Sequence, residues 1–225
     1  MKQYGIIFDM DGVLVDSYQA HFESWRRMLK QKGLELTEPE FAETFGRTSR
    51  DIIQHFFGDT MSDEEIARWD EEKEAEYREI ITADFPAMEG ASELIGALAE
   101  AGFRLAIGSS GPKKNVQTVL DNLPNAHLIA ASVNGQQVSR GKPAPDVFLR
   151  AAEKLEVPPA QCAVLEDALA GLDAAHAAGM AAAAITGTAP RGALAEKADI
   201  VVDSLRELTP AAMRQLIERR AAAVH

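Results

Sequence analysis

Short apolar segments alternating with longer helical patterns constrain the fold of this chain most strongly. Apolar runs of strand length occur at residues 4–10, 103–110, 127–132, 162–167, 181–186 and 198–204. Helical patterns stand between several of them, such as residues 91–102 and residues 169–178, and both end near a glycine. Strands joined by helices form parallel sheets, because each connection must cross back over the sheet. The sequence therefore predicts an α/β fold with a doubly wound parallel sheet.

Residues 18–85 interrupt this alternation. They show no strand pattern and contain four helical segments, at residues 21–33, 38–46, 49–58 and 62–81. The run of charges in the last segment is typical of a solvated helix face. We therefore expect a helical cap, residues 18–85, inserted into an α/β catalytic core formed by residues 1–17 and 86–225.

Composition limits the partners of this chain. Its 225 residues include 23 Lys and Arg against 35 Asp and Glu, which gives a net charge of −12 and disfavours a broad nucleic-acid surface. No apolar run is long enough to span a bilayer, and Asp9 and Asp11 break the early run before it resembles a signal peptide. The single cysteine, Cys162, excludes a disulfide within the chain. We expect a cytoplasmic protein with no nucleic-acid or membrane partner; a monomer fits the sequence, but the oligomeric state stays open.

Polar side chains follow four of the apolar runs. In open α/β sheets, ligands bind beyond the carboxyl ends of the strands. The four endings supply carboxylates, hydroxyls, an amine and carboxylates again: Asp9 and Asp11, Ser109 and Ser110, Lys142, and Glu166 and Asp167. This set suits a phosphoryl group with a hard divalent cation, because Mg²⁺ prefers oxygen ligands and cationic or hydroxyl donors stabilise phosphoryl oxygens.

The residue types indicate specific roles in phosphoryl chemistry. Asp9 and Asp167 can bind Mg²⁺, and a carboxylate such as Asp9 can also attack phosphorus to form an aspartyl-phosphate. Asp11 can serve as the general acid and base. Ser109 can donate its hydroxyl to a phosphate near a helix N-terminus. Each residue also has an ordinary structural interpretation: a turn or cap for the aspartate and serine, and a solvated loop amine for Lys142.

Four segments together resemble a known family. "DMDGVLVDS", "GSS", "GKPAPDVF" and "VLEDALAGLDAAHAAGM" resemble, in order, the four motifs of the haloacid dehalogenase superfamily of phosphohydrolases. The resemblance covers the whole chain, including a helical cap after the first strand.

The resemblance implies a role for each motif residue. It implies that Asp9 is the nucleophile and Asp11 the acid and base. The implied Mg²⁺ ligands are the Asp9 side chain, the Asp11 backbone carbonyl and Asp167, with Glu166 as a further ligand or a supporting residue. The implied phosphate-binding residues are Ser109, Ser110 and Lys142. Ala168 is a departure, because many relatives carry a small hydroxyl residue after the acidic pair.

The helical segment resembles the β-phosphoglucomutase and phosphoglycolate phosphatase-like subfamily. "HFESW", "GRTSRDII" and "KEAEY" are similar to its cap segments, which makes His21, Arg50 and Lys73 candidate substrate contacts. The residues alone leave alternatives open. His21 fits a packed or surface histidine equally well, Arg50 a surface arginine, and Lys73 a solvated ion pair with a nearby glutamate. Trp25 reads as a core residue.

The leading hypothesis is a Mg²⁺-dependent phosphatase that acts on a small phosphorylated metabolite. A sugar phosphomutase of the β-phosphoglucomutase type would use the same residues and return the phosphoryl group to the sugar. A non-catalytic phosphate sensor is a third hypothesis, because fold does not determine function. A dehalogenase would need neither Asp11 nor a metal, and a phosphonatase would need a Schiff-base lysine that no feature marks.

Overall fold

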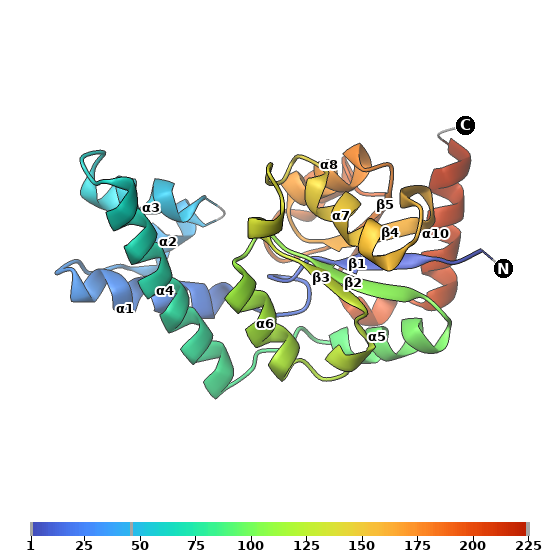
Figure 1. Ribbon diagram of the computed structural model, residues 1–225, viewed down its shortest axis with the longest axis horizontal. Coiled ribbons are helices and arrows are strands. Elements are labelled where there is room, and N and C mark those ends of the chain that lie inside the picture. The colour runs from blue at the N-terminus through green and yellow to red at the C-terminus, as the bar shows by residue number, and fades with distance from the viewer. Residues whose placement is uncertain (1, 46, 224–225) are drawn as a thin grey trace. The chain divides into compact units, whose positions relative to one another are not determined.

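The computed structural model describes residues 2–45 and 47–223 and divides into two compact units (Figure 1). The core unit comprises the chain up to Asp16 and from Pro86 onward. The helical unit comprises Ser17–Phe85. Each unit has its own buried apolar cluster, as expected of a compact substructure.

A parallel sheet forms the centre of the core unit. Within the described residues it has six strands in the order β3-β2-β1-β4-β5-β6, and every neighbouring pair is parallel. The strands are β1 (Gly5–Phe8), β2 (Arg104–Gly108), β3 (Ala131–Val133), β4 (Cys162–Glu166), β5 (Ala181–Ile185) and β6 (Ile200–Val202). From the central strand β1, the sheet extends through β2 to β3 in one direction and through β4 and β5 to β6 in the other. This order confirms the predicted doubly wound α/β fold.

Helices cover both faces of this sheet. In Figure 1, α7 and α8 lie on one face, and α5 and α10 lie on the other. The helices of the core unit are α5 (Ala91–Glu100), α6 (Lys113–Asn122), α7 (Asp146–Leu155), α8 (Leu169–Ala177), α9 (Arg191–Ala195) and α10 (Pro210–Ala223). Short 3₁₀ turns occupy Ala126–Leu128, Gly135–Gln137, Pro159–Gln161 and Leu205–Glu207.

The third strand lies later in the chain than the sequence predicts. The apolar run at residues 127–132 begins inside the 3₁₀ turn Ala126–Leu128, which follows Asn125 in the left-handed conformation. The ladder starts when the Ala130 N–H donates to the Leu105 carbonyl at 2.8 Å, and β3 ends at Val133. The turn therefore takes the first residues of the apolar run and shifts the strand toward the carboxyl end.

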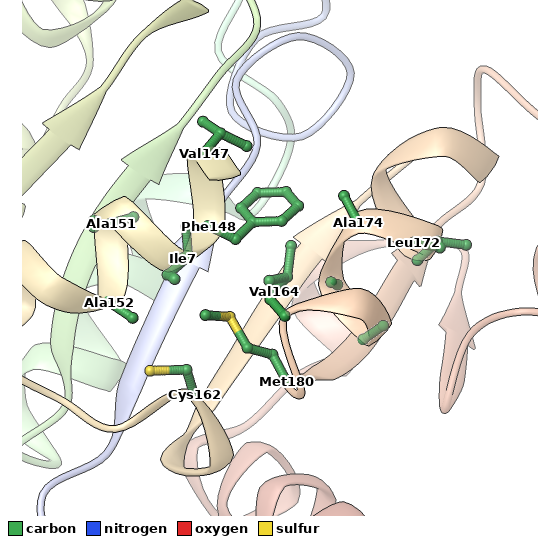
Figure 2. Close-up of a cluster of buried hydrophobic side chains, with 14 of the residues drawn as sticks. Ile7, Val147, Phe148, Ala151, Ala152, Cys162, Val164, Leu172, Ala174 and Met180 are labelled. Atoms are coloured by element: carbon green, nitrogen blue, oxygen red, sulfur yellow. The ribbon is translucent and has the colours of Figure 1, made fainter. Parts of the chain in front are cut away.

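The main apolar cluster lies between the sheet and the helices α7 and α8 (Figure 2). Ile7 and Val164 project into it from neighbouring strands, because alternate residues of a strand point to the same face. Phe148 of α7 is fully buried there. A Cβ placed on Gly108 would lie 3.0 Å from the Phe148 ring, so a glycine in β2 lets α7 approach closely. This packing fixes the carboxyl ends of the central strands.

Within its described residues, the helical unit consists of four helices with an apolar cluster of their own. Its helices are α1 (Tyr18–Gln31), α2 (Glu38–Thr44), α3 (Ser49–Phe57) and α4 (Asp63–Ala83). Capping boxes begin three of them, at Thr37, Thr48 and Ser62, each reciprocated by an acidic residue three positions on. Trp25, predicted to be a core residue, is 3 % exposed in the apolar cluster of this unit.

Candidate active site

The first motif follows the buried central strand β1. The Asp9 N–H still donates to the Leu165 carbonyl, at 2.9 Å, so Asp9 continues the ladder beside β4. The chain then turns, and the Met10 carbonyl accepts from the N–H groups of Leu14, at 2.9 Å, and Val15, at 3.1 Å. Asp9 is 8 % exposed, whereas Asp11 is half-buried within the turn. The turn therefore places one carboxylate inside the protein and leaves the other closer to its surface.

Gly12 allows this turn to press against the fourth motif. Its φ of +76° lies in the left-handed region that favours glycine. A Cβ at this position would overlap the Asp167 carboxylate and lie 2.6 Å from its Cγ. Only a residue without a side chain fits between the first motif and Asp167.

Glu166 and Asp167 follow β4 directly, and both are buried. Glu166 Oε2 accepts from the backbone N–H groups of Asp167, at 2.9 Å, and Ala168, at 3.0 Å. A Cβ at Gly171, in the first turn of α8, would overlap the Glu166 carboxylate. The Glu166 carboxylate is thus held in place by two backbone N–H groups and by close packing against the first turn of α8.

Lys142 joins the two acidic motifs. Its ammonium donates to Asp9 Oδ1 and to Glu166 Oε1, the latter at 2.6 Å. The Nζ atom also lies 4.9 Å from the centre of the Phe148 ring. Burial alone would lower the pKa of Lys142, but the two carboxylates raise it above its ordinary value, so the side chain stays charged.

Asp9, Glu166 and Asp167 form a cluster of buried carboxylates. Each offers an oxygen within 4.8 Å of the others. Burial raises the pKa of Asp9 to about 7 against the opposing effect of Lys142. Burial, and then the charge of Glu166, raises the pKa of Asp167 well above its ordinary range. These raised pKa values show that the three carboxyl groups are costly to ionise together beside Lys142, and a bound cation would favour their charged forms.

The second motif follows β2, the neighbour of β1. Ser109 is 2 % exposed, and its N–H donates to the Val133 carbonyl at 3.0 Å. Its hydroxyl oxygen accepts from the Gly111 N–H at 2.9 Å, which leaves the hydroxyl proton available as a donor. A Cβ at Gly111 would lie 3.4 Å from the Met10 side chain, so this loop lies beside the first motif. Ser110 is exposed at the same strand end.

The structure also shows a contact that no motif marks. Thr188, in the loop between β5 and α9, donates its hydroxyl to Asp167 Oδ2. The residue lies 21 positions after Asp167 in a segment that reads as an ordinary turn. The one signal in the sequence is that Thr188 also follows a predicted parallel strand, at the edge where ligands bind.

Two of the candidate residues of the helical unit contact each other, and the third lies apart from them. His21 stacks on Tyr77, with ring centres 4.3 Å apart, and its Nδ1 lies 2.8 Å from Lys73 Nζ. Lys73 also contacts Glu74 Oε1 at 2.8 Å. Arg50 lies apart from them and makes an exposed ion pair with Asp63 at 2.7 Å.

The expectation that Lys73 lies on a solvated face is wrong. Lys73 pairs with a glutamate, but it is 3 % exposed. The reason is helical spacing: Ile66, Lys73, Tyr77 and Ile81 recur at intervals of seven and four residues and form the buried side of α4. The Lys73 ammonium lies 5.6 Å from the Trp25 ring and 5.4 Å from the Tyr77 ring, which offsets part of its desolvation.

A parallel sheet with buried carboxylates, a lysine and a serine at its strand ends defines an α/β enzyme of phosphoryl transfer. A family model described as haloacid dehalogenase-like hydrolase matches residues 6–185. The chain therefore belongs to the haloacid dehalogenase-like hydrolases.

Curated relatives and solved structures agree with this assignment. The chain is 32 % identical to validoxylamine A 7'-phosphate phosphatase of Streptomyces hygroscopicus subsp. limoneus, over 90 % of this chain and 94 % of the relative. It is 32 % identical to hexitol phosphatase A of Escherichia coli (93 % and 94 % covered) and 29 % identical to β-phosphoglucomutase of Bacillus subtilis (91 % of each). A family IA hydrolase from Entamoeba histolytica superposes with a TM-score of 0.86 at 29 % identity, covering 97 % of this chain and 100 % of that one. The protein is thus an enzyme, a phosphohydrolase of this family.

Among the described residues, no helix is both long enough and apolar enough to cross a membrane.

Proposed function

We propose that this enzyme is a Mg²⁺-dependent phosphatase that hydrolyses a small phosphorylated sugar or polyol through an aspartyl-phosphate on Asp9. The observation that carries the proposal is the contact of Lys142 with both Asp9 and Glu166, beside the Asp167 carboxylate. An ammonium between two buried carboxylates places a donor for phosphoryl oxygens beside a nucleophile. The named substrates of the phosphatase relatives, a hexitol phosphate and validoxylamine A 7'-phosphate, support the substrate class.

The donor set fits a divalent cation. Asp9, Glu166 and Asp167 supply hard oxygen ligands within 4.8 Å of one another, as Mg²⁺ requires. Of the three, Glu166 is the most engaged, because both of its oxygens already accept hydrogen bonds. We therefore assign Asp9, the Asp11 carbonyl and Asp167 as ligands and Glu166 as their support. When bound, the cation would neutralise part of the negative charge on the phosphoryl oxygens.

The chemistry of the chain's own residues proceeds in two displacements. Asp9 attacks phosphorus, an Asp9–phosphorus bond forms, and the bond from phosphorus to the alcohol oxygen breaks. Asp11 gives its proton to that oxygen, so a neutral alcohol leaves. A water molecule then attacks the phosphoryl group, Asp11 takes its proton, and the Asp9–phosphorus bond breaks to release phosphate. Asp11 is suited to both proton transfers because it is half-buried at the turn after Asp9.

Lys142 and the second motif hold the phosphoryl group in this scheme. Lys142 keeps its charge beside Asp9 and so stabilises the oxygens that gain negative charge. Ser109 contributes a hydroxyl, and Ser110 lies exposed at the same strand end. Hydrogen bonds hold Lys142 and Ser109 in place before substrate binds, which limits the reorganisation that the reaction requires.

The helical unit selects the substrate in this proposal. His21, Arg50 and Lys73 are its candidate contact residues. Lys73 Nζ lies 2.8 Å from His21 Nδ1, so these two candidate contact residues would act together on a substrate hydroxyl. Arg50 is exposed and can bind a second anionic or hydroxyl group.

A phosphomutase is the second candidate, favoured by the β-phosphoglucomutase relative. Product analysis separates the two functions. The enzyme would be given hexitol phosphates and glucose 1-phosphate with Mg²⁺, with phosphate release measured and isomerised sugar phosphate followed by NMR. We expect phosphate release without isomerisation. Isomerisation without net release would establish the mutase and contradict the phosphatase.

A further inference from the structure

One oxygen of the Asp167 carboxylate is engaged by the loop after β5. This oxygen, Oδ2, accepts the Thr188 hydroxyl, and a Cβ at Gly12 would overlap the same oxygen. The Thr188 hydroxyl oxygen would lie 3.3 Å from that Cβ, so the turn of the first motif and the loop after β5 enclose Oδ2 together. The next residue, Ala168, offers no hydroxyl of its own.

The loop that carries Thr188 is anchored on both sides. Thr186 Oγ1 donates to Asp203 Oδ1 at 2.9 Å, and the Arg191 guanidinium donates to the same oxygen. The Thr186 N–H also donates to the Val202 carbonyl at 3.0 Å, which continues the ladder between β5 and β6. Although Thr188 itself is exposed, these contacts hold its loop against the sheet edge.

We propose that Thr188 is a positioning residue for the metal site: its hydroxyl fixes the rotation of the Asp167 carboxylate and keeps the other oxygen turned to the cation. This inference rests on the proposed function, because it assumes that Asp167 binds the metal. Groups that orient metal ligands commonly change metal affinity by about 10–100-fold when they are removed. Thr188 would act in this way without touching substrate or metal.

The test compares Thr188→Val, which keeps the shape and removes the hydroxyl, with Thr188→Ser, which keeps the hydroxyl. Thr118→Val is the matched control, because the half-buried Thr118 donates its hydroxyl only locally, to the Lys114 carbonyl within α6. Mn²⁺ and Mg²⁺ affinities would be measured by calorimetry on the substrate-free proteins, and thermal unfolding would be followed in parallel. We expect Thr188→Val to weaken metal binding about tenfold, with Thr188→Ser within about twofold of wild type. Thr118→Val should match wild type.

Three results would overturn the inference, and they are distinguishable. If the wild-type protein binds metal and Thr188→Val binds it equally well, Thr188 has no positioning role and the proposed function is untouched. If neither protein binds a divalent cation, the metal assignment fails and the inference fails with it. Weaker binding in both Thr188→Val and Thr188→Ser would also contradict it, because the hydroxyl would then not be the group that matters.

Discussion

At the scale of single residues, this site requires two glycines as well as its charged side chains. Gly12 and Gly171 stand where any Cβ would overlap the Asp167 or Glu166 carboxylate. The sequence places a glycine after the first acidic pair, but it does not say what the glycine leaves room for. For Gly12, that information belongs to its contact with Asp167, a residue far along the chain. The glycines therefore connect local backbone geometry to the position of the proposed ligands.

The substitution Gly12→Ala separates backbone strain from this packing. Gly102→Ala is the control, because Gly102 has a φ of +84° but open space around it. Both variants should lose about 1–2 kcal/mol of unfolding free energy from the left-handed backbone. Gly12→Ala should lose more, and should also bind Mg²⁺ more weakly, because its methyl displaces Asp167. Urea unfolding and calorimetry would measure both effects; equal losses with unchanged metal affinity would contradict this account.

At the scale of elements, the sequence predicted the helices and strands whose positions are set by local apolar patterns. The strands β1 and β4 are short apolar runs that end at acidic residues, and both lie where the patterns placed them. β3 was misplaced because a 3₁₀ turn begins within its apolar run. Lys73 was misjudged because a run of charges hides the seven- and four-residue spacing that buries one side of α4. Local signals therefore predict most elements, whereas burial of a charge depends on what packs against the helix.

The buried pair on α4 carries a stability prediction. Lys73→Met removes the ammonium that contacts Glu74, which is 7 % exposed, and should cost about 3 kcal/mol of unfolding free energy. Arg50→Met breaks an exposed ion pair and should cost less than about 1 kcal/mol. Denaturation followed by tryptophan fluorescence reports on the helical unit, because Trp25 and Trp69 both lie in it.

The double variant Lys73→Met with Glu74→Gln makes this comparison sharper. It removes both charges, so it should recover part of the stability that Lys73→Met loses. If Lys73→Met were no less stable than Arg50→Met, the buried pair would not stabilise the helical unit.

At the scale of the whole molecule, the sheet topology brings together residues that the sequence keeps apart. Lys142 contacts Asp9 across 133 positions, because both follow strands of one parallel sheet. The motif order and the strand pattern sufficed to predict that these residues would share a sheet edge. They did not predict that Lys142 would bridge Asp9 and Glu166, or that Thr188 would contact Asp167. Such contacts depend on loop conformations, which carry no periodic signal.

The proposed role of Asp9 as nucleophile would be tested by looking for the phosphoryl group on Asp9 during turnover. The enzyme would be mixed with Mg²⁺ and a hexitol phosphate that it hydrolyses, quenched in acid, and analysed by peptide mass spectrometry. We expect a phosphoryl group on the peptide that contains Asp9, and we expect it to be absent after chelation of the metal. We also expect that Asp9→Asn, still folded by circular dichroism, loses at least about 1000-fold in turnover. Phosphate release with no phosphorylated Asp9, or an active Asp9→Asn variant, would contradict this role.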